Sequence, residues 1–184
     1  MGRIKGTNLS HVREFVVKEL GGDALARLDA ALPAASREAF ASFSATGWYP
    51  EEVYVEVVRA LDDAVGAGNG DMLRRGGAYA AEYDISRIHR LFFRIANPAF
   101  VLEKSTEIWA RFFDTGEWTI KRQKATSAEG VLTGWTITDD RSCEYLRAYI
   151  QRMFEIVGAK DVENRHVECR ARGGAQCRFL IAWR

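Results

Sequence analysis

The sequence has few of the features that mark membrane-spanning, secreted or disordered proteins. No run approaches the roughly 18 consecutive apolar residues of a membrane-spanning helix, and residues 1–7 lack the apolar core of a secretory signal. Only three cysteines and three prolines occur in 184 residues. An odd number of cysteines argues against a disulfide framework. We therefore expect a cytoplasmic protein with free thiols.

An excess of either charge is also absent. The 26 basic and 25 acidic side chains leave a net charge of +1. This balance argues against the broad basic surface of a general nucleic-acid binder or a membrane-surface protein. In contrast, 47% of the residues are hydrophobic and 11% are aromatic. That composition supplies a core and excludes a disordered chain, and the length suits a single domain.

Motifs of common catalytic and nucleotide-binding sites are missing as well. The sequence contains no P-loop, no nucleophile elbow, no His-Glu-x-x-His motif and no nicotinamide or flavin fingerprint. Acidic pairs at 51–52, 62–63 and 139–140 lie at expected helix starts or on polar faces, where capping and solvation explain them. We expect a non-catalytic protein without a bound nucleotide.

Helical periodicity dominates residues 1–115. Ser10 and Asp23 are expected N-caps, and Pro50 suits a first helical turn. Glycines and prolines separate the periodic segments. The expected helices cover approximately 10–20, 23–32, 34–43, 50–65, 71–83, 86 onward, and 98–116.

The pattern changes after residue 115. Trp118, Ile120 and the run 131–137 predict two strands joined by a turn at 127–130. Asp139 and Asp140 begin a periodic helix that ends at Gly158, and residues 160–183 predict a hairpin turning at Gly173-Gly174. The expected fold is α+β: a helical block packed on a small antiparallel sheet, with the C-terminal order hairpin, helix, hairpin. We expect residues 1–184 to form one domain.

Three cysteines and one histidine form a constellation near the C-terminal end. Cys143, His166, Cys169 and Cys177 have the spacing Cys-x22-His-x2-Cys-x7-Cys. Thiolate and imidazole are ligands that Zn²⁺ prefers, and four of them close a tetrahedral structural site. Cys143 falls in the first turn of a helix, where the helix dipole lowers the pKa of a thiol. Zinc there would fasten that helix to the following hairpin.

The spacing leaves alternatives open. Buried cysteines often serve simply as small hydrophobic residues. His166 and Cys169 are three residues apart, so they point to opposite faces of a regular strand, and both can bind a metal only if a bulge intervenes. Glu168 is the alternative fourth ligand.

The segment HVECRARGGAQCRF, residues 166–179, resembles the end of the 4-vinyl reductase domain. The shared features are a cysteine, a glycine, and a second cysteine with an aromatic residue after it. The family would cover the second half of the chain and includes sensor domains that bind zinc through three cysteines and a glutamate. The resemblance implies zinc binding by Cys143, Cys169 and Cys177, with His166 in place of the glutamate. The first half, with Lys5-Gly6 and residues 48–50, resembles an uncharacterised family abundant in myxobacteria.

The wider superfamily of the 4-vinyl reductase domain includes TRAPP vesicle-tethering subunits and haem-based nitric oxide sensors. Those sensors hold the porphyrin with a Tyr-x-Ser-x-Arg motif and a helical histidine. The nearest segment, Tyr83-Asp-Ile-Ser-Arg87, has a different spacing, and His89 suits an ordinary amphipathic helix equally well. We therefore expect no haem.

Aromatic residues are concentrated in the helical block, where most should form the core and some line an apolar pocket. The candidate ligand-binding residues are His89, Phe93, Trp109 and Trp118; His89 and Trp118 each offer an N–H donor. The leading hypothesis is a sensory module that binds an apolar or aromatic small molecule and contains structural zinc. It would form a homodimer and signal through a separate partner protein. The alternative is a dimeric scaffold resembling the TRAPP subunits, without a free ligand.

Overall fold

The computed structural model describes residues 2–88 and 97–184. The first half is largely helical, as expected. Two short π-helical segments, Val16–Leu20 and Leu61–Val65, extend the first and fourth helices. The elements of this half are β1 (Arg3–Lys5), α1 (Gly6–Phe15), α2 (Gly22–Ala31), α3 (Ala34–Ser42), β2 (Trp48–Pro50), α4 (Glu51–Ala60) and α5 (Asp71–Ile88).

The second half confirms the α+β class and the order hairpin, helix, hairpin. Its sheet is antiparallel throughout, in the order β3-β4-β6-β5. Among the described helices, none is long and apolar enough to cross a membrane. The elements are α6 (Pro98–Phe112), β3 (Glu117–Lys124), β4 (Ser127–Thr133), α7 (Asp140–Ile156), β5 (Glu163–Glu168), a 3₁₀ turn (Arg170–Arg172) and β6 (Cys177–Ala182).

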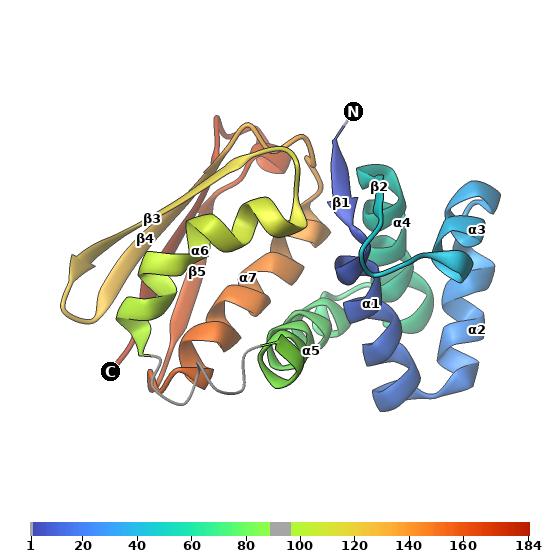
Figure 1. The fold of residues 1–184 in the computed structure, drawn as a ribbon, viewed down its shortest axis with the longest axis horizontal. Helices are drawn as coiled ribbons and strands as arrows, with labels where there is room; N and C mark the ends of the chain where they lie inside the picture. Colours follow the sequence, from blue (N-terminus) through green and yellow to red (C-terminus); the bar gives the residue numbers. More distant parts are fainter. Residues whose placement is uncertain (1, 89–96) are drawn as a thin grey trace.

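The helices form layers on one face of the four-stranded sheet. Figure 1 shows α6 and α7 against this face, α5 beside α7, and α1–α4 beyond α5. Alternating residues of β4 and β6, such as Leu132, Phe179 and Ile181, are buried beneath the helices because side chains of a strand point alternately to its two faces. The core thus continues from the sheet through α7 and α5 into the first four helices.

Several helix boundaries differ from the prediction. Asp23 is not an N-cap, because α2 already begins at Gly22, and α6 ends at Phe112 instead of near Gly116. Ser10 is not an N-cap, because α1 already begins at Gly6, and the Ser10 hydroxyl donates back to the Gly6 carbonyl at 3.3 Å. The cause is a pairing distant in sequence: β1 pairs with β2, with Ile4 opposite Tyr49, which fixes the start of the chain. The two helices expected on either side of residue 85 are one continuous helix, α5.

The first hairpin turns earlier than predicted. Lys124 pairs with Ser127, so the turn lies at 125–126 and the segment 127–130 belongs to strand β4. Gly130 was interpreted as a turn residue, but its role is steric. A Cβ at this position would overlap the indole of Trp118, so the glycine admits this ring against the sheet.

Glu51 joins the two halves of the molecule. It lies in the first turn of α4 and is 5% exposed. The hydroxyl of Thr115 donates to one carboxylate oxygen at 2.6 Å, and the hydroxyl of Thr136 donates to the other. The expectation of a solvated carboxylate was therefore wrong for Glu51, because the loops before β3 and after β4 cover it.

Candidate functional site

Four potential metal ligands converge between the start of α7 and the last hairpin. One ligand atom each of Cys143, His166, Cys169 and Cys177 lies within 4.8 Å of the others. The Sγ of Cys143 is 3.9 Å from that of Cys177 and 3.8 Å from that of Cys169. A tetrahedral zinc with Zn–S bonds of about 2.3 Å separates its sulfurs by about 3.8 Å. The spacing of the sulfurs therefore fits a zinc site.

Local structure explains how these side chains meet. The Asp139 carboxylate caps α7 by accepting from the Ser142 N–H at 2.9 Å, which sets Cys143 in the first turn. The register of β5 against β6 shifts between His166 and Glu168. This irregularity is the bulge that two ligands three residues apart require.

The fourth position of the cluster is occupied by His166 and not by Glu168. The carboxylate of Glu168 accepts from the Ala175 N–H at 3.2 Å and pairs with Arg178, so it is engaged away from the thiols. The imidazole of His166 stacks on Phe179 with centroids 4.3 Å apart. Its buried Nε2 forms no hydrogen bond of ordinary geometry in the protein; the imidazole lies beside Cys177, whose pKa it lowers, in the position of a fourth ligand.

The three thiols differ in acidity. A hydrogen bond to Cys177, together with burial, raises the pKa of Cys143, so the lowering expected from the helix dipole was wrong for this residue. Burial is the main cause that raises the pKa of Cys169. The thiolate of Cys177 accepts a hydrogen bond from Cys143 and lies beside His166, which lowers its pKa to about 4. Cys177 is therefore the thiol that ionises most readily.

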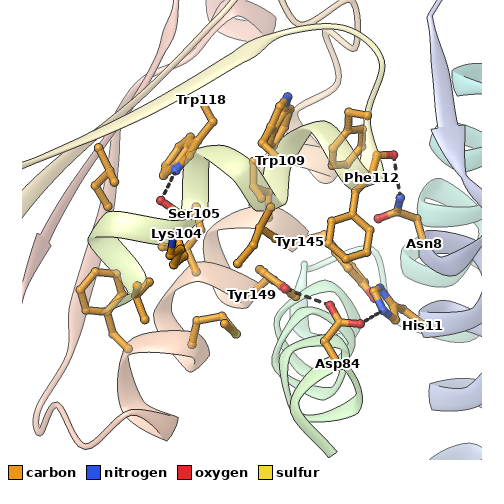
Figure 2. Close-up of a pocket in the computed structure, with 18 of the residues that line it drawn as sticks. Asn8, His11, Asp84, Lys104, Ser105, Trp109, Phe112, Trp118, Tyr145 and Tyr149 are labelled. Atoms are coloured by element: carbon orange, nitrogen blue, oxygen red, sulfur yellow. Dashed lines mark hydrogen bonds and ion pairs between the residues drawn. The ribbon is translucent and has the colours of Figure 1, made fainter. Parts of the chain in front are cut away.

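A second feature, an aromatic cavity, lies between α6, α7 and the sheet and reaches α1 and α5 (Figure 2). Its volume is about 100 Å³. Trp109 stacks on Phe113 with ring centroids 4.3 Å apart, and both rings meet Trp135 edge-on. These rings fill the part of the interface close to the loop between α6 and β3, and the cavity remains beside them.

The cavity has a polar end formed by three side chains from three helices: His11 and Asp84 are buried, and Tyr149 is partly buried. The Asp84 carboxylate on α5 contacts Nε2 of His11 at 2.6 Å and accepts from the Tyr149 hydroxyl at 2.9 Å. Figure 2 shows this network at one end of the lining. Helices α5 and α7 can approach because residue 77 is glycine: a Cβ there would overlap the carbonyl oxygen of Tyr145.

Two of the four predicted ligand-binding residues line the cavity. The indole N–H of Trp118 donates to the Ser105 hydroxyl at 3.1 Å, and that of Trp109 donates to the Thr115 and Gly116 carbonyls. Both indoles therefore contribute apolar surface, while their N–H groups have partners in the protein. The other two, His89 and Phe93, lie outside the described residues.

Sequence reasoning missed the polar network and two further lining residues, Tyr145 and Trp135. The sequence contained a signal for the residues of this set that lie on α7. Tyr145 and Tyr149 are four residues apart on a strongly periodic helix, a spacing that puts two polar-tipped aromatic side chains on one face. The link from α7 to His11 has no local signal, because it depends on how three helices pack.

Comparisons with known proteins identify the fold. No model of a known protein family and no functionally curated protein matches the sequence. Among solved structures, a mutant H-NOX protein from S. oneidensis matches with a TM-score of 0.76 and 12% identity, over 98% of this chain and 96% of that one. An H-NOX protein from S. oneidensis in the Fe(II)NO state gives 0.75 at 12% identity, over 98% and 99% of the two chains. An H-NOX mutant from K. algicida gives 0.73 at 12% identity, over 98% and 97%. The chain therefore has the H-NOX fold from end to end.

This result corrects the family assignment. The expected relationships to the 4-vinyl reductase domain and to the myxobacterial family were wrong, because no family model matches and the whole chain follows the H-NOX architecture instead. The misleading signal was the segment 166–179. Cysteines on either side of a glycine turn are typical of metal-binding hairpins in general, so this pattern is not specific to one family.

Haem is implied by this fold, so we tested whether the described lining fits it. Pockets for drug-sized ligands measure roughly 300–1,000 Å³, several times the cavity volume. Histidine, cysteine thiolate or tyrosine usually holds haem iron. Among the described lining residues, His11 is the one histidine, and its Nε2 is engaged by Asp84. Burial raises the pKa of the three tyrosines of the described lining, Tyr54, Tyr145 and Tyr149, well above the usual range, which disfavours tyrosinate. The described lining does not fit a haem.

Proposed function

We propose that the protein is a sensory module that binds a small apolar molecule in the aromatic cavity, while zinc in the Cys/His cluster has a structural role. The observation that carries the proposal is the cavity itself. It is mainly apolar and includes a few convergent polar groups, the combination typical of small-molecule sites. It also touches α1, α5, α6 and α7, so a ligand there would contact elements from both halves of the chain.

The zinc part of the proposal is supported by the geometry of the cluster. The sulfurs are spaced as tetrahedral zinc requires, and four protein ligands leave no position open for a substrate. The ligands come from α7 and from the hairpin of β5 and β6. A metal there would hold α7, which lines the cavity through Tyr145 and Tyr149, against the sheet. Zinc would thus act on ligand binding indirectly.

A thermal-shift screen tests the ligand-binding part. A molecule that binds only the native protein raises the melting temperature by mass action. We expect small apolar and aromatic compounds to raise it, and larger compounds to have no effect. Protein purified without a histidine tag should contain about one zinc per chain. A broad screen without a shift, or a preparation that retains haem instead, would overturn the proposal.

The scaffold alternative has less support. A protein-binding scaffold would present a contiguous apolar surface. Within the described part of the chain, the large hydrophobic side chains that are exposed are Val17, Trp48 and Val167, on three separate elements. Isolated side chains of this kind are usual on soluble domains.

A further inference from the structure

The cavity lining contains two buried polar atoms that have no partner in the protein. The hydroxyl of Tyr145 and Nε1 of Trp135 form no hydrogen bond, although the two residues are 4% and 1% exposed. Buried polar groups are almost always hydrogen-bonded, because leaving one unpaired costs about 1–3 kcal/mol. Both residues line the same cavity. The lining thus carries hydrogen-bonding capacity that the protein does not use.

Both unpaired groups point to the same kind of ligand. An indole Nε1 is only a donor, and a protonated phenol donates readily. Burial, with the nearby Tyr54 and Asp84, raises the pKa of Tyr145, so its hydroxyl keeps the proton. The carboxylate in this region, that of Asp84, already receives Tyr149 and contacts His11 through its two oxygens. A ligand would therefore have to supply an acceptor.

The size of the cavity limits the ligand. An engineered apolar cavity of about 150 Å³ holds benzene, so about 100 Å³ suits a molecule of about four to six non-hydrogen atoms. An ionised ligand is disfavoured, because the two charged side chains of the lining are already paired, Asp84 with His11 and Tyr149 and Lys104 with Glu107, and burying a charge without a free counter-charge is too costly. The Asp84 carboxylate is also close enough to influence Tyr145, which disfavours an anion.

We propose that the cavity binds a small neutral carbonyl compound, such as a short ketone, aldehyde or amide, whose oxygen accepts a hydrogen bond from Tyr145. This inference rests on the proposed ligand-binding function and names the ligand class. Tyr145 lies between the indoles of Trp109 and Trp118 and the Asp84 network (Figure 2). A bound carbonyl would therefore meet a donor in the middle of the cavity, with its hydrocarbon part against the aromatic rings.

The test compares two probes of the same shape. Cyclopentanone carries a carbonyl oxygen, and methylenecyclopentane replaces that oxygen with a CH₂ group. Binding is followed by two-dimensional NMR of the tryptophan indole N–H signals, with Trp135→Phe used to assign the Trp135 signal. We expect cyclopentanone to bind the zinc-loaded protein about fivefold more tightly than methylenecyclopentane, the advantage of one hydrogen bond.

Two variants at neighbouring tyrosines identify the donor. Tyr145→Phe should remove the advantage of the ketone without lowering the stability of the free protein, because the hydroxyl it removes has no partner. Tyr149→Phe is the matched control: its hydroxyl is already bound to Asp84, so the preference for the ketone should remain. If both probes bind equally, or if Tyr145→Phe leaves the preference unchanged, the carbonyl inference fails while the proposed function stands. If neither probe binds, the ligand-binding function fails as well.

Discussion

The Cys/His cluster and the aromatic cavity share helix α7, and both contain buried polar atoms without a partner in the protein, but those atoms are arranged differently. At the start of α7, Cys143 meets three other ligand atoms within 4.8 Å. Only two residues further on, Tyr145 has a hydroxyl without a partner. The first region has a set of donor atoms complete enough for a metal. In the cavity, hydrogen-bonding groups without a partner lie beside an open volume. A binding site for an exchangeable ligand requires both.

The two regions also differ in what each contributes to stability. A metal that binds only the folded chain adds its binding free energy to that of folding. A cavity does the opposite, because unfilled volume and unpaired polar atoms both lower stability. We infer that the cluster fixes α7 and thereby allows the neighbouring region to remain incompletely packed.

The largest expected effect comes from removing one ligand of the cluster. Cys169→Ser should reduce the zinc content from about one per chain to nearly none and lower the free energy of unfolding by about 3 kcal/mol or more, because metal binding is coupled to folding. Elemental analysis and chemical denaturation measure both quantities. The control is the wild-type protein in a strong chelator, which should match the variant. A small loss of stability with no effect of the chelator would mean that the cysteine merely packs in the core.

The cluster could be predicted from the sequence, and the cavity only in part. Four ligand residues at metal-binding spacing are a local signal, and the structure has the bulge after His166 that this spacing demands. The choice between His166 and Glu168 needed the structure, because the alternation of strand residues is broken at that bulge. The haem-based nitric oxide sensors were set aside because the sequence lacks their motif, yet the fold that matches is that of H-NOX proteins.

The polar end of the cavity was beyond sequence reasoning for a physical reason. His11, Asp84 and Tyr149 are brought together by α1, α5 and α7, and each side chain alone looks like an ordinary member of an amphipathic helix. Trp109 was predicted as an aromatic residue of the pocket and Trp118 as an N–H donor; both line the cavity, but their N–H groups already have partners in the protein.

Removing the hydrogen bonds at the polar end of the cavity should lower the free energy of unfolding less than removing a zinc ligand does. The Cys/His cluster should remain intact. Asp84→Ala removes the acceptor shared by His11 and Tyr149, and we expect the free energy of unfolding to fall by about 2–3 kcal/mol. The zinc content should not change. Tyr149→Phe, which loses one hydrogen bond, should cost about 1 kcal/mol. Loss of zinc in Asp84→Ala would show that the two regions are not separate units of stability.

The smallest expected effect comes from filling the cavity. Val101 lines it and is buried, and Val101→Leu adds one methylene group. We expect the free energy of unfolding to rise by about 0.8 kcal/mol and the thermal shift caused by small ligands to decrease, because the added group occupies part of the cavity. The matched control is Val65→Leu, at a partly buried valine outside the lining. Destabilisation by Val101→Leu with ligand binding retained would show that this side of the cavity is already closely packed.

Native mass spectrometry of the untagged protein tests the central claim most directly, because it reports metal and retained cofactor in one measurement. The account predicts a mass that exceeds that of the polypeptide by one zinc ion per chain, the loss of this ion in Cys169→Ser, and no additional mass corresponding to haem. A wild-type chain that carries stoichiometric haem, or one that carries no zinc, would contradict it.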